Sequence, residues 1–272
     1  MRALPRNDPR QYDDLAGEWW RPGGAFEMLH WLAAARAELV PPAERPAAVL
    51  LDVGCGAGLL APHVRDRGYR HVGVDLVRSA LDQAAGRGVL PVVGDATRLP
   101  LADGVADVVV AGELLEHLTD LGGAVAELCR VLRPGGLLVL DTLNATALSR
   151  WLTITAAERV PGVPRGIHDP GLYVDPAVLT AECARHGVRL WVRGLRPTVG
   201  GLARWLLTAV GAAKPVGVVG PGRAGTPVGT LGRVVPIRST AVLYQAMGRR
   251  GGAVPPAPAA VGTTQERQFH AG

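Results

Sequence analysis

Short apolar runs alternate with amphipathic segments through the middle of the chain, and this rhythm predicts the fold. The runs with the length and the Val and Leu content of buried strands are residues 49–53, 71–75, 90–93, 106–111 and 137–143. The segments between them that have helical periodicity are residues 59–67, 79–86 and 121–132. Strands that alternate with helices predict an α/β fold with a doubly wound, mostly parallel sheet. A ligand is then expected at the carboxyl ends of the strands.

The pattern changes after Asn144. Residues 176–186 have the pattern of a helix, and residues 188–195 and 240–247 have the pattern of strands. We therefore predict a seven-stranded, Rossmann-like sheet whose last strand is antiparallel. Between the last two strands lies an apolar insert, residues 200–235, which Gly and Pro interrupt repeatedly.

Aromatic residues concentrate before the first strand. Residues 12–39 have a helical pattern that includes Trp19, Trp20 and Phe26, although aromatics are only 4% of the chain. This segment is either a lid over a site or a helical extension that packs on the core. Residues 1–10 are polar and Pro-containing, which predicts a loose end.

The chain thus divides into three parts. Residues 1–46 form a helical N-terminal extension or lid, and residues 47–250 form the α/β domain that contains the insert. Residues 251–272 are rich in Gly, Pro and Ala and are predicted to be a disordered tail.

Composition narrows the setting more than the function. The net charge is +5, but the arginines are scattered and form no dense basic run, so we expect no nucleic-acid partner. The three cysteines have no CxxC spacing, and no apolar run reaches about 18 residues. Residues 1–10 have no apolar stretch, so we predict no signal peptide. We expect reduced thiols in a cytoplasmic protein. Cys55 lies in a glycine turn and is interpreted as a small side chain rather than a reactive thiol.

The first predicted strand ends in the sequence LDVGCGAG, in which Gly54, Gly56 and Gly58 alternate with other residues. Glycines remove side chains where the backbone turns sharply and approaches a ligand. The helix that follows is expected to present unpaired N–H groups and its positive dipole end to that ligand. The turn alone indicates a nucleotide-like cofactor.

Acidic residues end or adjoin three of the predicted strands. Asp75 follows the glycine turn by about 20 residues and can accept hydrogen bonds from both ribose hydroxyls of a nucleoside, or it caps the next helix. Asp95, with Ala96, can place a carboxylate beside an adenine amino group, or it is a plain turn residue. Asp52 precedes the glycine turn and either holds the turn or faces the cofactor.

Five motifs in this order resemble class I S-adenosylmethionine-dependent methyltransferases: LDVGCGAG, VDL, GDATRLPL, ADVVVAGELLEHL and LRPGG. The resemblance covers about residues 47–143. Dehydrogenases share the strand, turn and helix but require GxGxxG, which is absent at the glycine turn. The resemblance implies S-adenosylmethionine as cofactor, held by residues that include Leu76 next to Asp75.

A closer resemblance extends over about residues 12–179. Its motifs are Glu18-Trp19-Trp20, Phe26, Leu29-His30, Arg36, the ELLEH segment at 113–117, the TLN segment at 142–144 and the GIHD segment at 166–169. Together they resemble the O-methyltransferases of ubiquinone biosynthesis, which methylate catechol-type polyprenyl phenols. The resemblance implies that Arg36, Gly54, Asp75 and Gly112 contact the cofactor. Gly112 stands where that family has a larger residue, which a contact through the backbone would tolerate.

The ELLEH segment carries the candidate catalytic groups. The spacing of Glu113, Glu116 and His117 places all three on one face if the segment is a helix. Two carboxylates and an imidazole can bind Mg²⁺ or another divalent cation, and the family resemblance implies such a metal. Without a metal, Glu113 and Glu116 line or cap the site, and His117 is either the candidate general base or a packed residue.

The remaining motifs concern the acceptor. His168 and Asp169 either tie down a Pro- and Gly-rich loop or lie at the substrate mouth. Residues 151–160, together with residues 202–210, form either an apolar mouth or part of the core, and the resemblance implies membrane-lipid contact for the first of these. The chain departs from the family after about residue 195, which is where acceptor specificity can differ.

The expected function is O-methylation of a phenol or catechol hydroxyl on a lipophilic small molecule. One alternative is a methyltransferase of specialised metabolism that acts on oxygen, nitrogen or carbon without a metal. Another is a non-catalytic scaffold that binds cofactor or a membrane surface. The protein is expected to be cytoplasmic, with possible contact to the inner face of a membrane.

Overall fold

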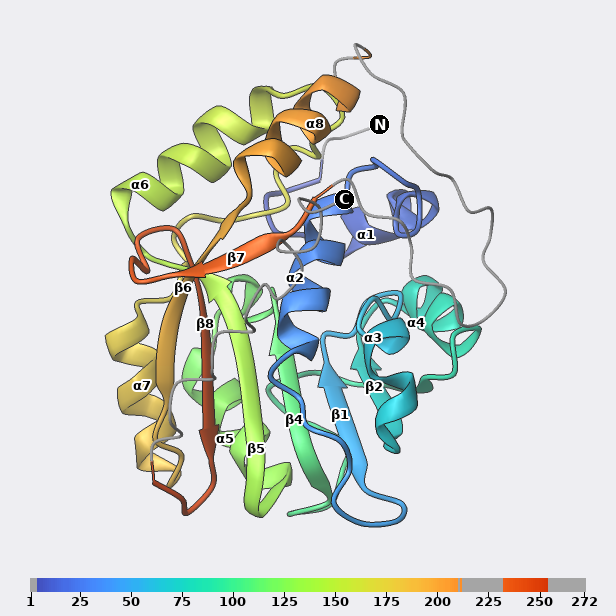
Figure 1. Cartoon of the computed structure of the whole chain (residues 1–272), viewed down its shortest axis with the longest axis vertical. Helices are drawn as coiled ribbons and strands as arrows, with labels where there is room; N and C mark the ends of the chain where they lie inside the picture. The colour runs from blue at the N-terminus through green and yellow to red at the C-terminus, as the bar shows by residue number, and fades with distance from the viewer. Residues whose placement is uncertain (1–3, 210, 212–231, 254–272) are drawn as a thin grey trace, which may run out of the picture.

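The computed structural model describes residues 4–209, 211 and 232–253, and a single mixed sheet is the centre of this part of the chain (Figure 1). The eight strands within it have the order β3-β2-β1-β4-β5-β8-β6-β7. Their bounds are β1 Val49–Val53, β2 Arg70–Asp75, β3 Leu90–Val93, β4 Ala106–Gly112, β5 Leu132–Leu143, β6 Trp191–Pro197, β7 Val234–Ile237 and β8 Leu243–Arg249. The pairings from β3 through to β5 are parallel, and the pairings among β5, β8, β6 and β7 are antiparallel.

Helices cover both faces of the sheet. Their bounds are α1 Arg10–Asp14, α2 Glu27–Ala37, α3 Ala61–Val64, α4 Arg78–Ala85, α5 Leu121–Val131, α6 Ala147–Arg150, α7 Pro176–Arg185 and α8 Val199–Ala209. Helices α5 and α7 pack together on one face, and α2, α3 and α4 lie on the other (Figure 1). A π-helical turn, Trp151–Ala156, and a 3-10 turn, Ala157–Arg159, extend α6.

The alternation of side chains along each strand divides the core between the two faces. In β1, Leu51 packs in the cluster that contains α5, whereas Leu50 packs in the cluster that contains residues of α3. Both side chains are fully buried. Burial on both sides is the reason that the parallel strands are continuous apolar runs in the sequence.

The sequence predicted the sheet class correctly and placed β1 and β3 to the residue. The structure has one more strand than the seven predicted, because β7 pairs with β6 at the end of the insert. The residues before it in the insert include α8, which extends the predicted apolar helix at 202–210. Residues 212–231 of the insert and 254–272 of the predicted disordered tail lie outside the described residues.

Two expectations about local structure need correction. Residues 1–10 were predicted to be a loose end; residues 1–3 lie outside the described residues, but the backbone N–H of Asn7 donates to Gly166 O at 2.8 Å, and Pro5 O accepts a bond from Gln11 Nε2. The helix predicted at 59–67 is confirmed over residues 61–67, where α3 supplies four α-helical residues and a 3-10 turn, Arg65–Arg67, follows.

Candidate active site

A cleft opens at the carboxyl ends of β1, β2 and β4, where open α/β sheets bind their ligands. The sequence-predicted residues that line it are Arg36, Asp52, Gly54, Gly56, Asp75, Leu76, Asp95, Ala96, Gly112, Glu113 and His117. Gly58 and Glu116 are not part of the lining. The fold therefore gathers at one place residues that are spread over about 80 positions of sequence.

The glycine turn adopts the backbone conformation that its composition predicts. Gly54, Gly56 and Gly58 all have positive φ, between 50° and 77°. A Cβ on Gly56 would lie 2.7 Å from the ring of Trp19, and one on Gly58 would lie 3.1 Å from Ala84. Gly58 thus makes room for packing against α4, whereas Gly54 and Gly56 border the cleft.

The N–H groups of the turn itself are paired within the protein. Gly54 and Cys55 donate to the carbonyl of Val74, and the N–H of Gly56 donates to Asp75 Oδ2 at 2.8 Å. Burial raises the pKa of the Cys55 thiol well above its usual range, which supports a packing role for this side chain rather than a reactive one. The turn is therefore a fixed wall of the cleft that is bonded to the end of β2.

Asp75 joins the turn to the start of α4. Its Oδ1 accepts the N–H of Val77 at 2.9 Å, while Oδ2 accepts the N–H of Gly56. It is not the N-cap of α4, because Val77 occupies that position and no side chain caps it. Burial raises the pKa of Asp75, against these two bonds that lower it. Each carboxylate oxygen keeps acceptor capacity for a hydroxyl group in the cleft.

The two other aspartates differ in surroundings. Asp95 is exposed, and its Oδ1 accepts both the N–H and the hydroxyl of Thr97 at 2.8 Å, which is the local turn bonding that was one of its two interpretations. Asp52 is buried, and its Oδ2 lies 3.4 Å from His71 Nε2. Both still line the cleft.

Arg36 reaches the cleft from α2 and forms a buried ion pair. Its Nε and Nη2 donate to the two carboxylate oxygens of Asp141, each at 2.6 Å, and Asp141 has no exposed surface. Burial opposes the charged guanidinium, but Asp141 outweighs it, and the pKa of Arg36 is raised. Gly112 is paired with Asp141 across β4 and β5, and the guanidinium lies over it.

The predicted helical face of Glu113, Glu116 and His117 does not exist. Glu113 has a left-handed backbone with φ of 51°, and Leu115–His117 form a single 3-10 turn. Glu116 Oε2 accepts the hydroxyl of Thr142 at 2.7 Å, and its buried Oε1 has no hydrogen-bond partner among the described residues. Burial and the neighbouring Glu116 raise the pKa of Glu113.

His117 is bound by the N-terminal segment. Its Nδ1 lies 2.5 Å from Asn7 Oδ1, so Nδ1 carries the proton, and Nε2 lies 3.4 Å from the hydroxyl of Tyr12. Its ring stacks on that of His168, with centroids 5.1 Å apart. Burial lowers the pKa of His117 to about 3, so the imidazole is neutral at pH 7 and a weak base.

A different trio from the predicted one converges here. Ligand atoms of Glu116, His117 and His168 lie within 4.8 Å of one another, and Glu113 does not belong to this group. Burial also lowers the pKa of His168, to about 4, so both imidazoles are neutral. Neutral imidazoles and a carboxylate are suitable divalent-metal ligands.

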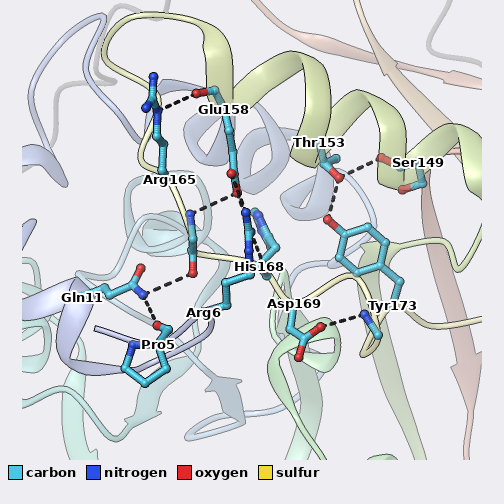
Figure 2. A network of polar contacts seen from close by, with 12 residues as sticks. Pro5, Arg6, Gln11, Ser149, Thr153, Glu158, Arg165, His168, Asp169 and Tyr173 are labelled. Carbon is cyan, nitrogen blue, oxygen red and sulfur yellow. Dashed lines mark hydrogen bonds and ion pairs between the residues drawn. The ribbon is translucent and has the colours of Figure 1, made fainter. Parts of the chain in front are cut away.

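Residues 5–12, here called the N-terminal strap, are bonded to the segment that contains Glu158 and His168 (Figure 2). Arg6 donates from both terminal nitrogens to the carboxylate of Glu158, at 2.7 and 2.8 Å, and to the carbonyl of His168 at 3.0 Å. Asp169 accepts the N–H of Gly171 and so serves its own loop. Of the two interpretations of the loop at 166–169, His168 therefore faces the site and Asp169 ties the loop.

The aromatic residues of the N-terminal part form a stack at the cleft. Trp19 stacks on Phe26 with centroids 4.2 Å apart and on Tyr12 at 5.8 Å. Tyr12 and Trp19 line the cleft, and Trp19 is only 6% exposed. The segment therefore packs on the core and covers Gly56 of the glycine turn.

Helices α6 and α8 lie at the same end of the molecule, beyond the carboxyl ends of the parallel strands (Figure 1), and they carry exposed large apolar side chains. They are Leu148, Trp151 and Leu152 in α6 and its extension, and Val199 and Leu207 in α8, with exposures of 36–75%. Trp205 of α8 is instead buried in a cluster with Trp31 and Tyr173. Among the described residues, no helix has the length and apolar character needed to span a bilayer.

Two site residues and one contact were not found from the sequence. Asn7, Asp141 and the pairing of His168 with His117 belong to no motif, and they reach the site only through the packing of distant segments. The contact of Asp141 with Arg36 spans 105 positions, and that of Asn7 with His117 spans 110.

Comparison with known proteins agrees with this geometry. A model of the methyltransferase domain matches residues 51–140. The ubiquinone biosynthesis O-methyltransferase of Thiobacillus denitrificans is 33% identical over 187 residues, which cover 65% of this chain and 81% of that protein. The enzyme of the same name from Methylobacterium nodulans is 31% identical over 206 residues, covering 68% and 83%.

Solved structures show the same fold. An S-adenosylmethionine-dependent methyltransferase from Thermotoga maritima, described as a possible histamine N-methyltransferase, has a TM-score of 0.58 and 15% identity, covering 89% of this chain and 97% of that one. Family, fold and cleft are thus in agreement. The chain is an S-adenosylmethionine-dependent methyltransferase and belongs to the family of the ubiquinone biosynthesis O-methyltransferases.

Proposed function

We propose that the protein methylates a phenol or catechol hydroxyl of a lipophilic small molecule. The observation that carries the proposal is the position of Glu116, His117 and His168 beside the cofactor cleft, at the end of the molecule where apolar side chains are exposed. The names of the curated relatives support oxygen as the methylated atom and a quinone precursor as the acceptor class.

The residues of the cleft fit the cofactor. Asp75 offers acceptors for ribose hydroxyls, Gly54 and Gly56 bring the backbone of the turn to the cleft wall, and Arg36 offers a cation for a carboxylate. When bound, S-adenosylmethionine supplies a methyl group on a positively charged sulfur. The chain itself then has to orient the acceptor hydroxyl and remove its proton.

The buried trio also fits a divalent cation such as Mg²⁺. Glu116 Oε1 lacks a hydrogen-bond partner within the described residues, and a metal ion would satisfy it. Such an ion would lower the pKa of a phenol oxygen. We therefore favour Glu116, His117 and His168 as the metal ligands over the set predicted from the sequence, which included Glu113. We also favour the ligand role of His117 over the general-base role, since burial makes its imidazole a weak base.

The direct test supplies isotope-labelled S-adenosylmethionine and a panel of acceptors. The panel pairs each catechol and monophenol carrying an apolar tail with the same ring carrying nitrogen or carbon nucleophiles instead. We expect label on the oxygen of tailed phenols, identified by mass spectrometry, and less label with Asp75→Asn when the cofactor is limiting. Labelling confined to nitrogen or carbon would contradict the proposal.

The metal is tested separately. Mn²⁺ or Mg²⁺ alone is titrated by calorimetry into chelator-treated protein, and we expect binding that His168→Gln weakens about tenfold or more. His186→Gln is the control, since His186 lies in α7's C-terminal cap, away from the trio. Absence of binding of either ion to the wild type would remove the metal from the mechanism.

Contact with a membrane surface is the remaining part of the proposal. Leu148 is 50% exposed in α6, and Leu90 is 46% exposed at the far edge strand β3. We expect Leu148→Ser to reduce co-sedimentation with phospholipid vesicles and Leu90→Ser to leave it unchanged. Equal effects of the two changes would exclude a specific membrane face at α6.

A further inference from the structure

Asp141 binds Arg36 from strand β5, and strand β4 lies between β5 and the strand that leads into the glycine turn. Asp141 is on β5, β5 is paired with β4, and Gly112 is the direct neighbour of Asp141 in that pairing. The N–H of Glu113 also donates to the carbonyl of Asp141 at 2.9 Å. Since Asp141 is also paired with Gln245 of β8, its backbone is held between two neighbouring strands.

The guanidinium occupies space that exists only because residue 112 is glycine. A Cβ at that position would lie 1.8 Å from Arg36 Cζ and 1.9 Å from Nη2. Gly112 does not have a positive φ, so the backbone itself does not require glycine there. The absence of a side chain at residue 112 therefore makes room for the Arg36 guanidinium.

The bidentate pair leaves one terminal nitrogen of Arg36 for other contacts. Nε and Nη2 are both bonded to Asp141, and Nη1 has no hydrogen-bond partner within the parts of the chain that the structure describes. Arg36 lines the cleft. A planar guanidinium held at two nitrogens has a fixed direction for its third donor group, which favours a planar anion.

The charges of the cleft indicate which group of the cofactor Arg36 would contact. The acids of the lining are Asp52, Asp75, Asp95 and Glu113, and the sulfonium and amino group of S-adenosylmethionine are cations. Its α-carboxylate is its one anionic group, and Arg36 is the arginine in the lining. An anion would be repelled by the acids and attracted to Arg36.

We propose that Asp141 is a positioning residue for cofactor recognition, which holds Arg36 over Gly112 as a fixed clamp for the carboxylate of the cofactor's amino-acid moiety. Asp141 does not touch the cofactor in this arrangement. Its contribution is to select ligands that carry the carboxylate over ligands that lack it.

The test measures binding of two ligands that differ only in this group. S-Adenosylhomocysteine and its decarboxylated analogue are titrated by calorimetry into the wild type and into Asp141→Asn. We expect the variant to bind S-adenosylhomocysteine about tenfold or more weakly, as for loss of a charge-assisted bond, and the decarboxylated analogue within about twofold of the wild type.

Asp107→Asn is the matched control. Asp107 lies at the opposite end of β4 and also accepts two bonds from an arginine, Arg45, at 2.8 Å. Its loss removes an ion pair of the same chemistry away from the cleft, so the ratio of the two affinities should stay at the wild-type value.

Gly112→Ala is a second variant, to be used if Asp141→Asn does not fold. It retains both charges but displaces the guanidinium, so it should also weaken binding of S-adenosylhomocysteine relative to binding of the decarboxylated analogue. Equal weakening of both ligands in the folded variants, or no weakening of either, would overturn the positioning role. Failure of the wild type to bind S-adenosylhomocysteine would instead contradict cofactor binding at this cleft.

Discussion

Substitution of Gly112 by alanine should destabilise the protein strongly, although alanine is the smallest possible addition. Its Cβ would lie 1.8 Å from Arg36 Cζ, and ordinary contact begins near 3.4 Å, so the guanidinium must shift by at least about 1.6 Å. That shift breaks two bonds of 2.6 Å and leaves buried charges poorly paired. Breaking one side of a buried ion pair costs about 3–5 kcal/mol, and we expect about 3 kcal/mol here.

The assay is urea unfolding at equilibrium without ligand, with the free energy of unfolding compared between variants. Gly17→Ala is the control, because a Cβ there meets nothing within 4 Å, and it should change the free energy by less than about 0.5 kcal/mol. In an Arg36→Met/Asp141→Leu background, Gly112→Ala should cost less than about 1 kcal/mol. An equal cost in both backgrounds would refute the argument, since the effect would then not pass through the ion pair.

Three further predictions follow from other contacts. Burial raises the pKa of Glu116, so at pH 8 the metal-free fold holds an ionised buried carboxylate. Glu116→Gln should therefore have a higher free energy of unfolding than the wild type at pH 8, and this difference should shrink as the pH falls toward about 4.5. A difference in urea unfolding that does not change with pH would contradict this prediction. Arg6→Ala removes the bonds to Glu158 at a partly exposed site, so it should lower the free energy of unfolding by less than about 1 kcal/mol. It should nevertheless speed proteolytic cleavage of the N-terminal strap, and unchanged cleavage would argue that these bonds do not hold the strap in place. Asp75→Asn leaves only one acceptor for the N–H groups of Gly56 and Val77, and calorimetry should give at least tenfold weaker S-adenosylhomocysteine binding, an expectation that wild-type affinity would rule out.

The sequence was most informative where the pattern was local. The period of the apolar runs placed β1 and β3 because a strand buried on both faces needs only consecutive apolar residues. Gly54 and Asp75 were expected at one site because strand ends of a parallel sheet meet at one edge, and both line the cleft. The prediction that Glu113, Glu116 and His117 share one face was wrong, because their spacing implies a shared face only in a helix and Glu113 adopts a left-handed backbone instead.

The amino-acid sequence by itself determined the α/β class, the glycine turn and the family, since these depend on short-range patterns and on motifs in a fixed order. Only the tertiary structure decided which partners complete the site. Asp141 reaches Arg36, His168 reaches His117 and Asn7 reaches His117 across long stretches of chain, and no local signal encodes such pairs. Their contacts form because the sheet register and the packing of the N-terminal strap fix where each distant segment lies, and a sequence read position by position does not contain that register.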